Sequence, residues 1–253
     1  MLLLIDAGNT RIKWALADTA AAPGAWFAAG AVAHADTGQL AAAWQAALGK
    51  KSISRALLSN VAGAALRARL EQALPAALAP DAVRWFASQA QLAGVRNAYR
   101  DPFQLGCDRF AAAIGAHVLA PGQAVIVATC GTATTIDALG ADGVFLGGMI
   151  LPGLSLMASS LARDTAQLPH IDRIDRDMRL PAGFADNTDD AILSGCLAAQ
   201  AGAIERAFAA HGAALCLLSG GAAPFIAPGL ALPYRLVENI VLIGLQAAAG
   251  SRS

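Results

Sequence analysis

Two short stretches of this chain, residues 6–13 and 130–137, have a similar design, in which a glycine turn joins two apolar runs. In the first stretch an apolar run ends on Asp6, a carboxylate that is costly to bury without a partner. Gly8 and Asn9, which tolerate positive φ, then turn the chain into a second apolar run. Two such hairpins in one chain indicate a duplicated architecture.

The first turn has the groups needed to hold a phosphate and a divalent cation. Backbone N–H groups in a glycine turn can approach an anion closely, and Asn9 and Thr10 add short hydrogen-bond donors. Lys13 adds a positive charge, and Asp6 is suited to hold Mg²⁺ directly or through water. The same pattern also occurs in ordinary hairpins, so this stretch by itself leaves both interpretations open.

The expected order of strands and helices repeats along the chain. The first half predicts strands at 2–5, 12–17, 25–32, 54–59 and 83–87, and helices at 37–48, 62–74 and 105–119. The second half predicts strands at 125–128, 132–139, 143–150, 215–218 and 234–236, helices at 154–161, 187–211 and 238–248, a short helix after Gly221, and an insertion at 169–181. Each half therefore has the order βββαβαβα, which predicts an α/β protein with a duplicated RNase H-like (actin-like ATPase) fold. We expect its domains at 1–121 and 122–253.

Composition excludes several function classes. The formal net charge is +0 and the basic residues are scattered, apart from Lys50 and Lys51, so no nucleic-acid footprint or polybasic membrane surface is expected. No apolar run reaches the roughly 18 residues that a membrane span needs, and Asp6 interrupts the run at the start of the chain. We therefore expect a cytoplasmic protein with no nucleic-acid or membrane partner.

The cysteines and histidines are dispersed along the sequence. They are Cys107, Cys130, Cys196 and Cys216, and His34, His117, His170 and His211. The cysteines lack the close pairs of zinc sites and redox motifs, so we interpret most of them as small buried residues in a reducing compartment. No nucleophile–histidine arrangement is present in the sequence, and each histidine is interpreted as structural or solvated.

Six motifs, in family order, resemble those of the type III pantothenate kinases. They are Asp6-x-Gly8-Asn9-Thr10, Asn97-x-Tyr99 with Leu105-Gly106-Cys107-Asp108-Arg109, Gly131-Thr132-Ala133-Thr134-Thr135-x-Asp137, Gly147-Gly148-x-Ile150-x-Pro152-Gly153, Thr165-Ala166-Gln167-Leu168-Pro169, and Asn187-Thr188. Each motif is weak alone, but the ordered set is specific. The resemblance implies an actin-like fold, a homodimer, and transfer of the ATP γ-phosphate to pantothenate, giving 4′-phosphopantothenate in the first step of coenzyme A biosynthesis.

The resemblance also implies roles for individual residues. The matches to the first phosphate-binding segment, which contacts ATP, are Asp6, Ala7, Gly8, Asn9, Thr10, Arg11, Ile12 and Lys13, and Thr132 matches a further ATP contact. The matches to the pantothenate site are Tyr99, Gly106, Cys107, Asp108, Arg109 and Thr188. In the family dimer the residue at the position of Thr188 comes from the partner subunit.

Asp108 is the expected general base. A primary alcohol does not readily lose its proton to water, so a carboxylate within hydrogen-bond reach is a reasonable acceptor during phosphoryl transfer. The adjacent Arg109 is expected to bind an anionic substrate group and to keep Asp108 ionised. The alternative for this pair is a helix N-terminal charge with a surface ion pair. Tyr99 as a core aromatic with a solvated hydroxyl, and Thr188 as a helix N-cap, are alternatives of the same kind.

Two positions depart from the family pattern. Many members have an aspartate two residues before the glycine of the second turn, as a ligand for a monovalent cation, whereas this chain has Thr129. A requirement for K⁺ or NH₄⁺ is expected, but its site is in doubt because a hydroxyl is a weaker ligand than a carboxylate. Ala222 replaces an expected acidic residue after Gly220 and Gly221, a turn that either lies near the nucleoside or only connects a strand to a helix.

Two other functions remain open from the sequence. One is a different actin-like small-molecule kinase, which the absence of a recognisable acidic sugar-site cluster disfavours. The other is a catalytically silent, nucleotide-binding regulatory protein with the same fold. The intact Asp6, Asp108 and Arg109 disfavour it.

Overall fold

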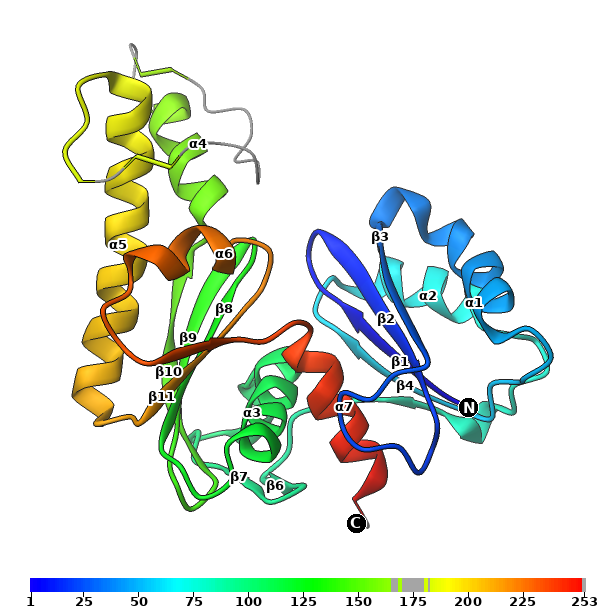
Figure 1. Cartoon of the computed structure of the whole chain (residues 1–253). Helices are drawn as coiled ribbons and strands as arrows, with labels where there is room; N and C mark the ends of the chain where they lie inside the picture. The colour runs from blue at the N-terminus through cyan, green and yellow to red at the C-terminus, as the bar shows by residue number, and fades with distance from the viewer. Residues whose placement is uncertain (165–167, 170–179, 182, 252–253) are drawn as a thin grey trace. The chain divides into compact units, whose positions relative to one another are not determined.

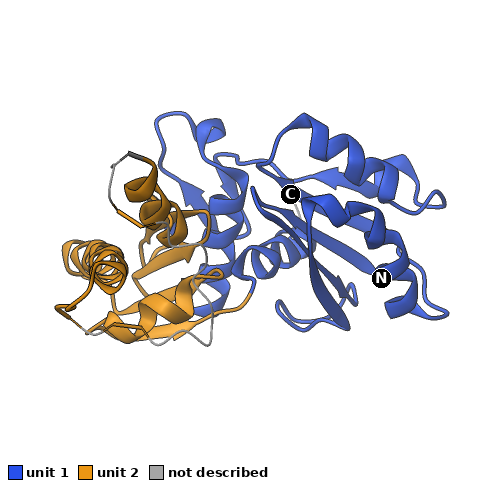
Figure 2. Ribbon diagram, turned by 90° about the horizontal axis from the view of Figure 1, so that it is seen from above, with its two compact units in different colours: residues 1–121, 143–145, 239–253 blue, residues 122–142, 146–238 orange. Residues whose placement is uncertain are grey.

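The computed structural model describes residues 1–164, 168–169, 180–181 and 183–251 (Figure 1). Their contacts divide the chain into two compact units (Figure 2). The first unit contains Met1–Pro121, Gly143–Phe145 and Asn239–Ser253, and the second contains Gly122–Asp142 and Leu146–Glu238. Most of the expected insertion at 169–181, and residues 165–167 of the fifth motif, lie outside the described residues.

The first unit is built on a five-stranded sheet with the strand order β3-β2-β1-β4-β5. The strands are β1 (Leu2–Ala7), β2 (Arg11–Ala17), β3 (Ala28–Ala33), β4 (Arg55–Asn60) and β5 (Val83–Trp85). β2 is antiparallel to both β1 and β3, whereas β4 is parallel to β1 and β5 is parallel to β4. All of β1 is buried, as the apolar run at its start indicates for a central strand, and the buried residues include Asp6.

The first unit also contains helical elements and a small hairpin. They are η1 (His34–Gln39), α1 (Leu40–Leu48), α2 (Ala64–Ala73), η2 (Pro80–Ala82), β6 (Gln91–Leu92), β7 (Val95–Asn97), η3 (Pro102–Gln104), α3 (Cys107–Leu119) and α7 (Ile240–Gly250).

The two faces of β1 have different partners. Leu3 and Ile5 belong to the core cluster that includes Trp44 of α1 and Leu70 of α2. Since side chains alternate along a strand, Asp6 shares the opposite face, and α7 packs against this strand.

The second unit repeats the first. Its elements are β8 (Val125–Cys130), β9 (Ala133–Leu139), β10 (Val144–Pro152), α4 (Leu154–Asp164), α5 (Thr188–His211), β11 (Leu215–Ser219), α6 (Ala223–Ile226), η4 (Ala227–Gly229) and β12 (Tyr234–Leu236). Its strand order is β12-β11-β8-β9-β10, which is the order of the first sheet when each strand is numbered within its own repeat. β9 is antiparallel to β8, and β11 and β12 continue in parallel, as in the first sheet.

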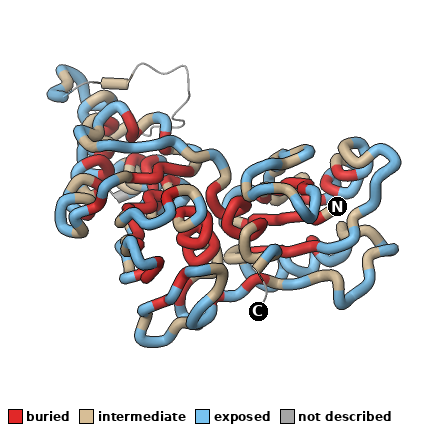
Figure 3. Tube along the Cα trace, turned by 60° about the horizontal axis from the view of Figure 1, so that its bottom comes forward, coloured by how far each residue is buried: buried red, intermediate tan, exposed pale blue. Residues whose placement is uncertain are grey.

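The matching strand orders and directions confirm the predicted duplicated RNase H-like fold. In each unit the buried residues concentrate along the central strands (Figure 3). The last helix, α7, follows the second repeat in sequence but packs on α3 and belongs to the first unit by its contacts. Glycine permits this close approach, because a Cβ on Gly244 would lie 1.7 Å from the carbonyl oxygen of Ala111.

The β6–β7 hairpin consists of two strands that the sequence pattern did not predict. Its strands, Gln91–Leu92 and Val95–Asn97, are too short to show an alternating pattern. Ala93 and Gly94, with φ of 50° and 82°, form the turn between them. Val144 and Phe145, the first residues of β10, pair with β7 within the first unit.

Among the described residues, no helix is both long enough and apolar enough to cross a membrane.

Candidate active site

The first glycine turn connects the central strand β1 to β2. The backbone N–H of Gly8 donates to the carbonyl of Arg11 over 3.2 Å, which closes the turn. Neither Gly8 nor Asn9 has a positive φ, so the predicted tight turn forms without the left-handed conformation that these residue types tolerate. The hydrogen bond between Gly8 and Arg11 closes the hairpin, and Asn9 and Thr10 are exposed at its tip.

Asp6 is a buried carboxylate in a row of polar side chains that crosses the sheet. Lys13 on β2 and Ser59 on β4 are its neighbours in register. The pKa of Asp6 is raised from 3.8 to about 7, mainly by burial. The charge of Lys13 opposes this rise in pKa, and the charge of Asp108 adds to it. The two carboxyl groups are therefore close enough to repel each other, although they are distant in the sequence.

Asp108 lies in the first turn of α3, as predicted, with Gly106 as the helix N-cap. Its Oδ1 accepts the backbone N–H of Arg109 over 2.8 Å. Burial raises the pKa of Asp108, although the hydrogen bond from Arg109 and the guanidinium charge lower it. Arg109 thus favours the ionised form of Asp108, while burial acts in the opposite direction and has the larger effect on its pKa. Mostly removed from solvent, Asp108 is not the surface ion pair of the alternative interpretation.

Arg109 and Tyr99 form a hydrogen-bonded pair in the candidate site. The buried guanidinium of Arg109 donates from Nη1 to the Tyr99 hydroxyl over 2.9 Å. Its Cζ also lies 5.7 Å from the Tyr99 ring centroid and 5.8 Å from that of Phe145. An arginine held among aromatic rings is well suited to bind an anionic group. The Tyr99 hydroxyl thus has a protein partner as well as access to solvent.

Asn97 explains the Asn-x-Tyr spacing of the second motif. This buried side chain accepts the backbone N–H of Tyr99 over 3.1 Å and donates to the carbonyl of Pro102 over 3.0 Å. These bonds fold residues 97–102 into a loop that presents Tyr99 to Arg109. The sequence alone assigned no role to Asn97 beyond its place in the motif.

Cys107 connects the start of α3 to the sheet. Its Sγ lies 3.3 Å from the hydroxyl of Ser59 and 3.7 Å from the carbonyl oxygen of Asn60. Burial raises the pKa of this thiol, which opposes a role as a nucleophile. The contact holds the helix end that carries Asp108 beside the strand next to β1.

The second glycine turn, in the second unit, is also closed by a backbone hydrogen bond from its glycine, but it is one residue shorter than the first. Gly131 donates to the carbonyl of Ala133 over 3.0 Å, and Thr132 is exposed at the tip. Two further glycines pack against this backbone, since a Cβ on Gly153 would lie 2.1 Å from the carbonyl oxygen of Gly131 and one on Gly220 would lie 2.2 Å from that of Cys130. Gly220, with φ of +96°, therefore supports this turn and does more than connect a strand to a helix.

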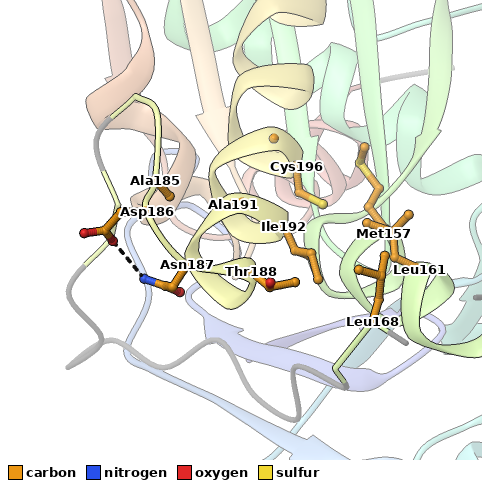
Figure 4. A pocket seen from close by; sticks show the side chains of 11 residues that line it. Met157, Leu161, Leu168, Ala185, Asp186, Asn187, Thr188, Ala191, Ile192 and Cys196 are labelled. Carbon is orange, nitrogen blue, oxygen red and sulfur yellow. Dashed lines mark hydrogen bonds between the residues drawn. The ribbon is translucent and has the colours of Figure 1, made fainter. Parts of the chain in front are cut away.

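Thr188 is the first residue of α5, and Asn187 is the N-cap, whose Oδ1 accepts the N–H of Asp190 over 3.0 Å. The alternative of Thr188 as N-cap was therefore wrong. Thr188 lines a largely apolar cavity of about 720 Å³ between α4 and the start of α5. In Figure 4, Met157 and Leu161 of α4 lie across this cavity from Ile192 of α5.

The predicted residues thus divide between the two units. Those of the first turn, Tyr99 and residues 106–109 belong to the first unit, and Thr132 and Thr188 belong to the second. The described residues contain no cluster of three His, Cys, Asp or Glu side chains that would hold a metal by itself. A single buried carboxylate, Asp6, beside a second one fits a hydrated Mg²⁺ that is also held by phosphates.

Comparisons with known proteins identify the family. Residues 2–210 match the family model described as type III pantothenate kinase. A type III pantothenate kinase of Herminiimonas arsenicoxydans is 59% identical over 258 residues, which cover 98% of this chain and 97% of that protein. Another, from Janthinobacterium sp. (strain Marseille), is 58% identical over 260 residues, with coverage of 98% and 97%.

Solved structures support the fold at low sequence identity. The activator of the 2-hydroxyisocaproyl-CoA dehydratase from Clostridium difficile superposes with a TM-score of 0.54 and 11% identity, covering 98% of this chain and 92% of that chain. A Sinorhizobium meliloti protein, described provisionally as a 2-dehydro-3-deoxygalactonokinase, gives 0.58 and 17%, with 98% of each chain covered. With its family motifs, full-length relatives and duplicated actin-like fold, this chain belongs to the type III pantothenate kinase family.

Proposed function

We propose that Asp108 is the general base in the ATP-dependent phosphorylation of pantothenate, the reaction that family membership assigns to this chain and the first step of coenzyme A biosynthesis. The observation that carries this proposal is the position of Asp108. It lies at the start of α3, close enough to the buried Asp6 to raise the pKa of that group, and next to the Arg109–Tyr99 pair.

In the proposed step, the substrate hydroxyl attacks the γ-phosphorus of ATP. A bond forms between the hydroxyl oxygen and phosphorus, the bond from phosphorus to the ADP oxygen breaks, and the hydroxyl proton passes to a carboxylate oxygen of Asp108. The raised pKa of Asp108 suits this role, because a base with a pKa nearer neutrality holds the transferred proton more firmly.

Arg109 is proposed to bind the carboxylate of pantothenate. A buried guanidinium has a large desolvation cost, which a bidentate carboxylate ligand offsets. The Tyr99 hydroxyl orients the guanidinium through the 2.9 Å hydrogen bond from Nη1. The other predicted contacts, Gly106 and Cys107, belong to the same segment. They would contact the substrate from the start of α3.

The residues of the first turn are proposed to bind the phosphates of ATP, and Thr132 of the second turn provides a further contact. The strand ends that flank the turn would contribute to phosphate binding through the backbone of Ala7, Arg11 and Ile12. Asp6 would hold Mg²⁺, which supplies charge neutralisation for the transferred phosphoryl group. Lys13, next to Asp6 in register, adds positive charge on the same face of the sheet.

The monovalent cation, K⁺ or NH₄⁺, is proposed to bind near Thr129. Thr135 on β9 and Ser219 on β11 lie beside Thr129 in register, so three hydroxyl side chains form one row across the second sheet. The Thr135 hydroxyl is buried and has no hydrogen-bond partner among the described residues, which supports an oxygen-lined site there. Omission of both cations in an activity assay tests whether either is needed.

A homodimer is proposed because the second unit, which contains Thr188, has exposed large hydrophobic side chains. Leu146, Met149 and Ile150 of β10 and Leu156 of α4 are all exposed large hydrophobic residues. Burial of this surface against a second copy would stabilise the dimer, and light scattering measures the oligomeric state directly. A monomer at micromolar concentration contradicts this part of the proposal. We also propose a cytoplasmic location, where ATP is available.

The function is tested with purified protein, ATP, Mg²⁺, K⁺ or NH₄⁺, and pantothenate, with detection of 4′-phosphopantothenate by mass spectrometry. A panel of sugars serves as the control for substrate class. Formation of a phosphorylated product from pantothenate, and from none of the sugars, supports the proposal. ATP binding without any product identifies the silent regulatory alternative, and turnover of a sugar identifies another kinase.

A further inference from the structure

We propose that His34 is a positioning residue for the first phosphate turn, an inference that rests on the proposed role of this turn in ATP binding. His34 is the first residue of η1, after β3. Its Nε2 lies 2.8 Å from the carbonyl oxygen of Gly8, within the turn. A carbonyl oxygen only accepts hydrogen bonds, so Nε2 carries the proton and donates it.

This hydrogen bond determines the direction of the next backbone donor. The C=O of Gly8 and the N–H of Asn9 belong to one planar peptide unit and point in opposite directions. When the Gly8 carbonyl is directed at His34, the Asn9 N–H is therefore directed away from His34. Asn9 is exposed at the tip of the turn, where this N–H is available to an anion.

The N–H of Gly8 is already used, because it donates to the carbonyl of Arg11 over 3.2 Å. The orientation of the 8–9 peptide therefore decides how the tip presents its donors. Without His34, this peptide is free to rotate, and the Gly8 carbonyl can turn toward the phosphates and repel them.

His34 is itself held from two elements. Its backbone carbonyl accepts the hydroxyl of Thr37 over 2.7 Å and Nη2 of Arg69, from α2, over 2.6 Å. Thr37 is buried, so one end of this network is fixed in the core. The chain of contacts thus connects α2 and η1 through the imidazole to the turn.

The test compares variants that keep or remove the donor at the position of Nε2. In His34→Gln the side-chain amide reaches about as far as Nε2 and keeps a donor, whereas His34→Phe keeps the ring without one. His34→Asn is polar but too short to reach Gly8. The control is His211→Phe, which removes the matching 3.0 Å contact of a ring nitrogen with a backbone carbonyl, that of Leu139, in the second unit.

The measurements are the Kd of a non-hydrolysable ATP analogue with Mg²⁺, the KM for pantothenate, and the melting temperature. We expect His34→Phe and His34→Asn to weaken nucleotide binding roughly fivefold to tenfold, as loss of one hydrogen bond predicts. His34→Gln should recover affinity to within about threefold of wild type, with the KM for pantothenate unchanged to within about twofold. His211→Phe should affect only the melting temperature.

Two results overturn the inference. One is a Kd of the ATP analogue that is no higher for His34→Phe and His34→Asn than for His211→Phe. The other is a His34→Gln variant that binds as weakly as His34→Asn, which would assign the effect to the ring and not to its donor. The nucleotide Kd does not depend on turnover. A wild-type protein that binds the analogue but phosphorylates nothing therefore contradicts the proposed reaction and leaves the test of His34 valid.

Discussion

The guanidinium of Arg109 donates a hydrogen bond to the hydroxyl of Tyr99 over 2.9 Å, between residues on α3 and on the loop that follows β7. Both groups have aromatic surroundings, since the Tyr99 and Phe145 ring centroids are 5.7 Å apart. In the proposed substrate site this pair provides a fixed cation, and its contribution can be measured by removing one atom.

Removal of the Tyr99 hydroxyl should weaken substrate binding selectively. In Tyr99→Phe the guanidinium loses one partner but keeps the ring contacts, so we expect the KM for pantothenate to rise roughly fivefold to tenfold. The value of kcat and the KM for ATP should change by less than about twofold. Steady-state kinetics measure all three, with the exposed Tyr234→Phe as control. An unchanged KM for pantothenate would exclude this pair from the substrate site.

Asp6 should make the stability of the ligand-free protein depend on pH. Its pKa is about 7 in the folded chain and ordinarily 3.8, so the folded state holds the proton more tightly. The contribution of Asp6 to the free energy of unfolding therefore falls as pH rises from about 4 through about 7. Asp6→Asn removes this dependence. At 1.36 kcal/mol per pKa unit, the variant should be more stable than wild type at pH 8 by at most roughly 4 kcal/mol.

Urea unfolding at pH 4, 6 and 8, without Mg²⁺ or nucleotide, measures this difference. The exposed Asp81→Asn is the control and should change the free energy of unfolding by less than about 0.5 kcal/mol. Equal stability of Asp6→Asn and wild type at pH 8 would show that burial does not penalise the Asp6 carboxylate.

Gln246 of α7 should contribute strongly to the stability of the first unit. Its Oε1 accepts the backbone N–H of Gly24 over 2.8 Å and Nε1 of Trp26 over 2.9 Å, and its Nε2 donates to the carbonyls of Ala21 and Ala22. Gln246→Ala leaves these groups without their partner, so we expect a loss of about 2–4 kcal/mol.

Chemical denaturation measures this loss, with Gln45→Ala on the exposed face of α1 as control. A change in Gln246→Ala as small as that of the control would mean that the loop between β2 and β3 does not depend on α7.

Much of the fold follows from local patterns in the sequence. The strand order of both sheets was predictable because two similar hairpins, each followed by alternating helices and strands, restrict the topology. Asp6 was recognisable because a carboxylate at the end of an apolar strand is unusual, and Asp108 because its segment resembles the pantothenate site of the family. The roles of Asn97, Ser59 and Gln246 were not predictable, because they depend on contacts between residues far apart in sequence.

Electrostatic properties were the least predictable part of the site. The sequence places Arg109 next to Asp108, which suggests a lowered pKa, but the degree of burial that raises it appears only in the folded chain. His34 is a similar case. A lone histidine has no distinguishing signal in the sequence, and the role proposed for His34 depends on the position of Gly8 in space.

The role of Asp108 is tested most directly by the single-turnover rate of 4′-phosphopantothenate formation in Asp108→Asn, with saturating Mg²⁺, ATP and pantothenate. The control is Asp101→Asn, at an exposed carboxylate that accepts the N–H of Phe103 in the same segment. We predict a rate at least about 100-fold below wild type for Asp108→Asn, with ATP affinity retained, and a near-normal rate for the control. A rate for Asp108→Asn within about threefold of wild type would contradict its role as the general base.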